Sequence, residues 1–111
     1  MKRITTSLLL TLAVSSSAFA GSYQYGKVTE VATTGDAVTF QLDTTDGADI
    51  RADNCQADTL NFSINFATKA AAKAMFDIVM ESKRTGVKIG VNGDGNCWAN
   101  GEFENADSIA F

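Results

Sequence analysis

Residues 69–84 read KAAAKAMFDIVMESKR, and this segment decides the fold. Its apolar side chains recur every three or four positions, which is the spacing of one face of an α-helix. They are Ala72, Met75, Phe76, Val79 and Met80. Thr68 precedes the segment as an N-cap residue, and Gly86 follows it as a C′ residue, with Lys83 and Arg84 in the last turn. The sequence therefore predicts one amphipathic helix.

Both flanks of this helix alternate apolar and polar residues, as half-buried β-strands do. The segments with this pattern are residues 23–31, 37–42 and 60–64 before the helix, and 87–91, 98–103 and 108–111 after it. Predicted turns lie at residues 33–36, 44–47 and 92–96, and residues 49–55 are either a short edge strand or irregular. Three strands, one helix and two or three more strands is the order of the OB-fold, a five-stranded antiparallel barrel. We expect one such domain over residues 21–111, with the helix capping its open end.

Residues 1–20 have the pattern of a secretory signal peptide. Lys2 and Arg3 precede an apolar core at residues 8–14, and the segment ends in Ala18-Phe19-Ala20, the pattern that signal peptidase cuts. A membrane anchor is the alternative, but the apolar run is too short to span ~30 Å of hydrocarbon. We therefore expect cleavage after Ala20, no membrane insertion and a secreted or periplasmic mature chain.

The mature chain is expected to be acidic. The full sequence has 9 basic and 13 acidic residues, and removal of Lys2 and Arg3 leaves seven basic residues and a net charge of −6. Such a charge repels phosphate backbones. Binding of an oligonucleotide to the OB face is therefore disfavoured, and we expect no nucleic-acid partner.

Cys55 and Cys97 are the only two cysteines, and an exported chain with one such pair is expected to form one disulfide. A reactive thiol or a metal pair is the alternative, but the chain has no His. Without His a nucleophile lacks its usual base, so we expect no catalytic residues and no enzyme activity. A calcium loop at residues 92–96 fails because Cys97 stands where an EF-hand needs Gly. We therefore predict neither a metal nor a cofactor.

Trp98, the only tryptophan, either packs in the core or forms an exposed platform beside residues 92–96. In an exposed position it would bind a sugar together with Asn96, Asp94 and Tyr25. An aromatic ring accepts the C–H face of a sugar, while amides and carboxylates orient its hydroxyl groups. Tyr23 and Tyr25 are equally consistent with surface anchors and with barrel lining. In OB barrels the ligand face lies on strands two and three, bordered here by the predicted loops 32–36 and 92–96.

The layout resembles the B subunits of bacterial AB-type toxins, notably those of the subtilase cytotoxin type. The resemblance rests on Gly26-Lys27-Val28 at the start of a strand, and on AMFDIV at 74–79 followed by KRTGVKI at 83–89. It implies homo-oligomeric rings of five, a helix that lines a central pore, and binding of cell-surface glycans. One departure is Tyr25, which stands where such glycan binders often present a small hydroxyl residue.

Two classes of function are consistent with these features. The first is an exported OB-fold module that binds a cell-surface glycan or a protein, either as a homo-oligomeric relative of toxin B subunits or as a solitary relative with no toxin role. The alternative is a periplasmic or secreted structural or protein-interaction factor with no small-molecule ligand.

Overall fold

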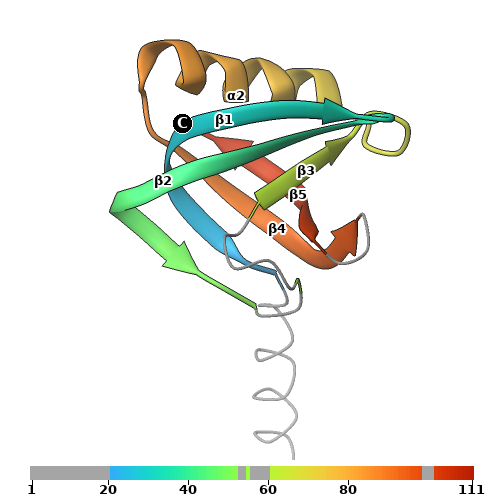
Figure 1. Cartoon of the computed structure of the whole chain (residues 1–111), viewed down its shortest axis with the longest axis horizontal. Helices are drawn as coiled ribbons and strands as arrows, with labels where there is room; N and C mark the ends of the chain where they lie inside the picture. The colour runs from blue at the N-terminus through green and yellow to red at the C-terminus, as the bar shows by residue number, and fades with distance from the viewer. Residues whose placement is uncertain (1–20, 53–54, 56–60, 99–101) are drawn as a thin grey trace, which may run out of the picture.

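A computed structural model of the chain describes residues 21–52, 55, 61–98 and 102–111 (Figure 1). The predicted signal peptide, residues 1–20, lies outside the described residues. The elements of the described part are β1 (Tyr23–Thr34), β2 (Ala37–Ile50), β3 (Asn61–Asn65), α2 (Ala72–Thr85), β4 (Ile89–Trp98) and β5 (Phe103–Ala110). The predicted mainly β architecture with one helix is confirmed for this part. Among the same residues, no helix has both the length and the apolar character needed to cross a membrane.

The strands pair into one sheet that closes on itself in the order β1-β2-β3-β5-β4. β1 is antiparallel to β2 and β4, and the pairs β2–β3 and β4–β5 are antiparallel as well. β3 and β5 are parallel, which corrects the fully antiparallel arrangement that we predicted. The reason is geometric. Strand directions cannot alternate all the way round a ring with an odd number of strands, so at least one neighbouring pair must be parallel.

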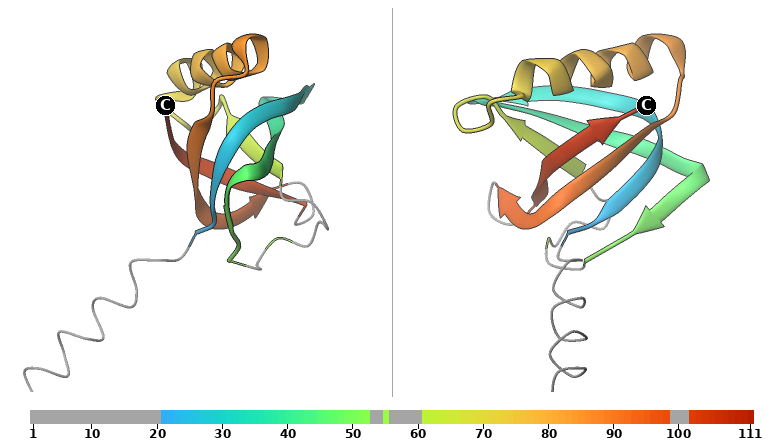
Figure 2. Two further views of the ribbon diagram at one scale, coloured as in Figure 1. Left: turned by 90° about the vertical axis from the view of Figure 1, so that its left-hand side faces the viewer. Right: turned by 180° about the vertical axis from the view of Figure 1, so that it is seen from behind.

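α2 lies across one end of this ring, as Figures 1 and 2 show from three sides. Its buried apolar residues Ala72, Met75 and Val79 belong to the core, together with side chains from the strands. The strand members of the core are Val28, Phe40, Leu42, Phe62, Ile64, Ile89, Val91 and Ala106. Phe76 and Met80 are half-buried at the margin of the helical face. The predicted apolar face of the helix therefore packs on the ring.

The sequence predicted the C-terminal end of α2 correctly and its N-terminal end wrongly. Gly86 adopts a left-handed conformation with φ 80° and is the C-cap. The helix begins three residues later than predicted, and the N-cap is Ala71 rather than Thr68. The chain forms a turn first, because the backbone N–H of Lys69 donates to the carbonyl of Asn65 at 3.0 Å. That turn uses the residues predicted to start the helix.

β2 continues through residues 44–47, which were predicted to form a turn between strands. The register with β1 shifts between Tyr25 and Lys27, where β2 contains three residues more than β1. The additional residues bend β2 sharply without reversing it (Figure 1). Asp43 stabilises the bend, since its Oδ1 accepts hydrogen bonds from the Thr45 N–H at 3.0 Å and the Thr45 hydroxyl at 2.6 Å. The predicted turn is therefore a bulge within a strand.

β4 runs through residues 92–96, so the prediction of a loop there is wrong. β4 extends to Trp98 and is antiparallel to β5, which begins at Phe103, and the register between the two strands shifts twice over the segment. A buried side chain explains why the segment stays in the sheet. The Glu104 carboxylate on β5 accepts a hydrogen bond from the backbone N–H of Gly95 at 3.1 Å.

Cys55 and Cys97 form the predicted disulfide, with their Cα atoms 5.6 Å apart. Cys97 lies near the end of β4, not between a turn at 92–96 and a separate strand beginning at Trp98 as predicted. The bond therefore joins the segment that follows β2 to β4.

Candidate ligand-binding site

The residues predicted to form a ligand site do not all converge. Asp94, Asn96 and Trp98 lie along the last part of β4, where the Asp94 carboxylate accepts a hydrogen bond from the Asn96 N–H at 2.8 Å. Tyr25 lies on β1 opposite Gly90, six residues along β4 from Asn96. At the rise of a β-strand, six residues span at most about 20 Å, so Tyr25 and Asn96 lie at different levels of β4. The side chain of Trp98 lies outside the described part of the structure.

A different set of side chains does lie together, on the outer face of the sheet. Tyr23 on β1 pairs with Ile50 on β2 and with Asn92 on β4. Asn92 in turn pairs with Ser108 on β5. Residues directly opposite each other on antiparallel strands share a face. These four residues therefore form a row across four strands, which we call the Tyr23 row.

The Tyr23 row lines a hollow of about 560 Å³, within the volume range of small-molecule sites. The other lining residues are Gly21, Arg51, Ala52, Gly93 and Asp107. Ile50, Asn92 and Ser108 are exposed, and Tyr23 is half-buried. The Asn92 Nδ2 donates to the Ser108 Oγ at 3.2 Å, so an amide and a hydroxyl stand side by side. The hollow combines apolar surface with groups that donate and accept hydrogen bonds.

Gly90 determines how the Tyr23 ring lies against the sheet. A Cβ atom at Gly90 would lie 2.8 Å from the Tyr23 Oη and 3.3 Å from its Cε1. Both distances are shorter than ordinary van der Waals contact, so the ring occupies the space that a side chain at this position would need. The absence of a side chain at Gly90 thus allows the ring to lie on the backbone of β4 while it lines the hollow.

The charged groups that line the hollow have partners of opposite sign. The Arg51 Nε lies 3.5 Å from the Asp49 Oδ1, and the Lys69 Nζ lies 3.1 Å from the Asp107 Oδ1. The lining therefore presents both signs of charge rather than a concentrated positive or negative potential. In the part of the chain that the structure describes, no three Cys, Asp or Glu side chains are grouped to hold a metal ion.

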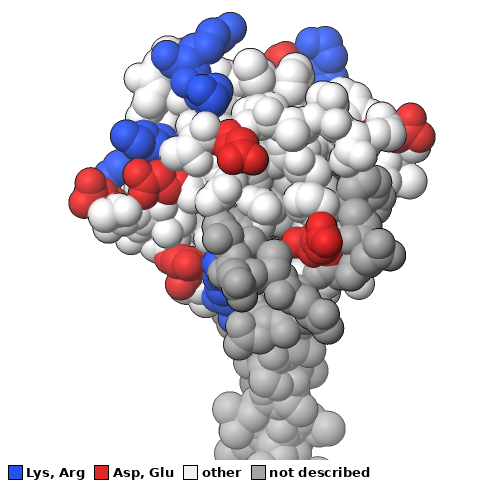
Figure 3. Space-filling model, viewed as in Figure 1, with Lys and Arg blue, Asp and Glu red and all other residues white. Residues whose placement is uncertain are grey.

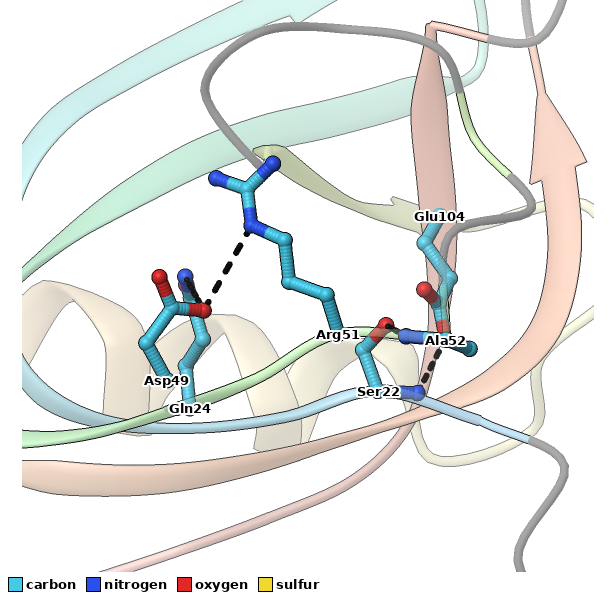
Figure 4. A network of polar contacts seen from close by, with 6 residues as sticks. All are labelled: Ser22, Gln24, Asp49, Arg51, Ala52 and Glu104. Atoms are coloured by element: carbon cyan, nitrogen blue, oxygen red, sulfur yellow. Dashed lines mark hydrogen bonds and ion pairs between the residues drawn. The ribbon is translucent and has the colours of Figure 1, made fainter.

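A buried polar network lies next to the hollow, inside the ring (Figure 4). Glu104 is 1% exposed, and its Oε2 accepts hydrogen bonds from the backbone N–H groups of Ser22 at 2.9 Å and Gly95 at 3.1 Å. The Ser22 hydroxyl accepts one from the Ala52 N–H at 2.9 Å. Gln24 is also buried, and its Oε1 has no hydrogen-bond partner among the described residues. This end of the ring is therefore filled by polar groups, unlike the end that α2 covers.

A second hollow of about 200 Å³ lies on the outer face of β1, β2, β3 and β5. Four of its lining residues follow one another across these strands, and we call them the Gln41 row: Glu30, Gln41, Asn61 and Phe103. β2 and β3 are the strands on which the sequence analysis placed the ligand face, but residues 92–96 do not line this hollow, and its volume is below the usual range for ligand sites. On the side shown in Figure 3, Lys and Arg lie mainly over α2 and around the bend of β2, and most of the remaining surface is uncharged.

The sequence alone left the role of Tyr23 open and gave no sign that Ile50 and Ser108 line a site. The alternation of Tyr23 with Ser22 and Gln24 was a usable signal, because it places the tyrosine on one face and the small or polar residues on the other. No comparable signal marks Ile50 or Ser108, whose places in the row depend on strand register.

No protein family model, no curated protein and no solved structure matches this chain.

Proposed function

We propose that the protein is an exported carbohydrate-binding module of the OB-fold type that holds a sugar beside the Tyr23 row. One observation carries the proposal. The aromatic ring of Tyr23, the amide of Asn92 and the hydroxyl of Ser108 follow one another along a hollow of about 560 Å³. A sugar ring has apolar C–H faces and a rim of hydroxyl groups, so it needs this combination of surfaces.

Each group in the row has a defined role in this proposal. The Tyr23 ring packs against the C–H face of the sugar, and the Ile50 side chain extends the apolar surface. The Asn92 amide and the Ser108 hydroxyl donate hydrogen bonds to the sugar hydroxyls and accept bonds from them. The Asp107 carboxylate, which lines the same hollow, accepts a further bond. No formal charge on the ligand is required.

The charge of the chain supports an uncharged ligand. The mature chain carries −6, and the charged groups lining the hollow are paired. Polyanions such as nucleic acids would be repelled at long range. Sugar affinity should therefore change little with salt, in contrast to the steep salt dependence of nucleic-acid binding.

Export and assembly belong to the same proposal. The pattern of residues 1–20 supports cleavage after Ala20, and the Cys55–Cys97 disulfide supports an oxidising compartment. The closed strand order with a helix between β3 and β4 supports the OB-fold assignment. The resemblance to toxin B subunits supports a homo-oligomer, in which identical weak sites would gain avidity without new contacts.

A glycan array probed with the exported protein tests the ligand class. We expect binding to a limited set of neutral glycans, and a loss of up to about tenfold in affinity for Tyr23→Ala, the size of a lost aromatic contact. Asn61→Ala, in the Gln41 row, is the matched control and should bind as the unaltered protein does. An array without binding, or a loss at Asn61 instead of Tyr23, would contradict the proposal.

The alternative of a protein-interaction factor has one supporting observation. Ile50 is 63% exposed, which is a large exposure for an apolar side chain on a strand. Such a factor would bind no sugar on the array, whether or not Tyr23 is intact. The same experiment therefore separates the two functions.

A further inference from the structure

We propose that cleavage after Ala20 creates an α-ammonium group on Gly21 that pairs with the buried carboxylate of Glu104. Removal of the signal peptide would then complete the polar network at this end of the ring. The inference rests on the processing step of the proposed function and is independent of sugar binding.

Glu104 is a buried acid without a cation. Its side chain is 1% exposed, and its Oε2 accepts hydrogen bonds from two backbone N–H groups. None of the ion pairs among the described residues involves Glu104. Burying a carboxylate is costly unless a group of opposite charge pairs with it. The structure thus contains a site for one positive charge that no side chain of the described residues fills.

The first residues after the cleavage position are held beside this carboxylate. The Ser22 N–H donates to the Glu104 Oε2 at 2.9 Å, and the Ser22 carbonyl accepts from the Gly93 N–H at 2.7 Å. Gly21 packs so closely on Gly93 that a Cβ atom at Gly21 would collide with the Gly93 carbonyl. Consecutive backbone nitrogens are at most about 3.6 Å apart. The Gly21 nitrogen therefore lies at most about 6.5 Å from the Glu104 Oε2, at the edge of the ~4–6 Å over which an opposite charge favours the charged form of a group.

The other charged groups around Gly21 are already engaged. Arg51 and Asp107 line the hollow with Gly21 and pair with Asp49 and Lys69 respectively. Asp94 is exposed and accepts a hydrogen bond from a backbone N–H of its own strand. Glu104 is thus the acid that a new ammonium group would neutralise.

Before cleavage the Gly21 nitrogen belongs to a neutral peptide bond, so the unprocessed chain lacks the pair. After cleavage the pair raises the pKa of the amine above its ordinary value of about 7.7–8.0. A raised pKa means that the added stability is fully present below the ordinary value and is lost as the pH rises through the folded-state value. The processed chain is therefore expected to be the more stable form at neutral pH.

The test uses the full chain, expressed and exported, with the mature protein collected. Its intact mass shows whether it begins at Gly21. The protein is then treated briefly with an amine-acetylating reagent at several pH values, and labelling of the Gly21 amine is followed by peptide mass spectrometry. We expect labelling at pH 7 to be slower than in the urea-unfolded protein, because a raised pKa leaves a smaller fraction of the amine in the reactive, unprotonated form. Glu104→Gln should remove most of this protection.

The possible results distinguish cleavage after Ala20 from formation of the ion pair with Glu104. A mature chain that does not begin at Gly21 overturns the processing step, and labelling as fast as in the unfolded chain overturns the ion pair. Protection that persists unchanged in Glu104→Gln also overturns it, because burial alone would then explain the slow reaction. If Glu104→Gln does not fold, the pH profile of the unaltered protein decides, and a midpoint at the ordinary value of the amine counts against the pair. The glycan array is unaffected by any of these results.

Discussion

The hydroxyl of Ser82 joins the last turn of α2 to β1 by accepting a hydrogen bond from the backbone N–H of Val28 at 2.9 Å. The same hydroxyl donates to the carbonyl of Val87 at 2.7 Å. Ser82 is fully buried, with 0% exposure, on a helix that is otherwise held to the ring by apolar contacts. One small polar side chain therefore fixes where the helix ends on the sheet.

Ser82→Ala should lower the free energy of unfolding by about 1–3 kcal/mol, the cost of leaving a buried donor without a partner. The Val28 N–H then loses its acceptor at a buried position. Thr85→Ala is the matched control, because the Thr85 hydroxyl bonds to the carbonyl of Glu81 on the exposed side of the same turn. Urea unfolding of both variants measures the difference. Equal losses of unfolding free energy in the two variants would mean that the buried Ser82 hydroxyl stabilises the fold no more than the exposed Thr85 hydroxyl does.

Met75→Ala should destabilise the protein by about 2–5 kcal/mol, as truncation of a buried side chain does. Phe76→Ala should cost less than the ~3–5 kcal/mol of a fully buried phenylalanine. Phe76 is half-buried and its ring meets that of the exposed Phe66 edge to face, with centroids 6.1 Å apart. Thermal or urea unfolding ranks the two variants, with exposed Lys73→Ala as the control. A larger loss of unfolding free energy for Phe76→Ala than for Met75→Ala would show that Phe76, and not Met75, contributes more to the packing of the helix on the ring.

The Cys55–Cys97 disulfide closes a loop with a sequence separation of 42 residues. Titration of the unfolded, unreduced protein should find almost no free thiol. Replacing both cysteines by serine should cost roughly 4 kcal/mol, the chain-entropy estimate for a loop of this length. Two titratable thiols in each chain would show that the bond does not form in the protein.

Gly90→Ala should weaken sugar binding about tenfold by displacing the Tyr23 ring, which contributes an aromatic contact to the proposed site. The new methyl group would approach the Tyr23 Oη most closely, at 2.8 Å. Tyr23→Phe removes that oxygen and should therefore restore part of the affinity in the Gly90→Ala background. Titration calorimetry with the glycan that binds most tightly on the array measures the affinity of the Gly90→Ala variant, the Tyr23→Phe variant and the variant that carries both substitutions. An unchanged affinity for Gly90→Ala would exclude the ring from the site.

Hydrogen bonds from the Thr45 hydroxyl and backbone N–H, aided by the charges of Lys27 and Lys88, hold the pKa of the Asp43 carboxyl below its ordinary value. A lowered acid pKa stabilises the fold above the unfolded-state value, and this contribution is lost as the pH falls through the folded-state value. Thr45→Val should raise the pKa of Asp43 towards its ordinary value, and Thr44→Val should not. Carboxyl titration by NMR compares the two variants. No change in Thr45→Val would rule out the side-chain hydrogen bond as the main cause.

Local patterns were sufficient to predict several features of the fold. Phe40 and Leu42 belong to the core as expected, and the face of α2 that contacts the core is the one with helical spacing. The C-cap at Gly86 and the pairing of the two cysteines were also predicted correctly. These features depend on residues close in the sequence, or on a choice among very few partners.

Residues 44–47 and 92–96 show where local patterns fail. Both segments are rich in Gly, Asp and Asn, which favour turns, yet both lie within long strands. In the second segment, the Gly95 N–H meets the Glu104 carboxylate nine residues further along the chain. Pairing with a neighbouring strand satisfies backbone groups that an isolated turn would have to satisfy by itself. Tertiary contacts therefore override the turn preference of these residues.

The sequence by itself determined which face of the helix is apolar, where the helix has its C-terminal end and which cysteines bond, because these properties follow from the period and chemistry of neighbouring residues or from a choice among very few partners. The tertiary structure alone decided that β3 and β5 run parallel, that Ser82 and Glu104 are buried, and that Ile50, Tyr23, Asn92 and Ser108 form one row. Each of these depends on the register between strands far apart in the chain. Register is set by the closure of the whole ring, where a shift of one residue would move every side chain of a strand to the opposite face.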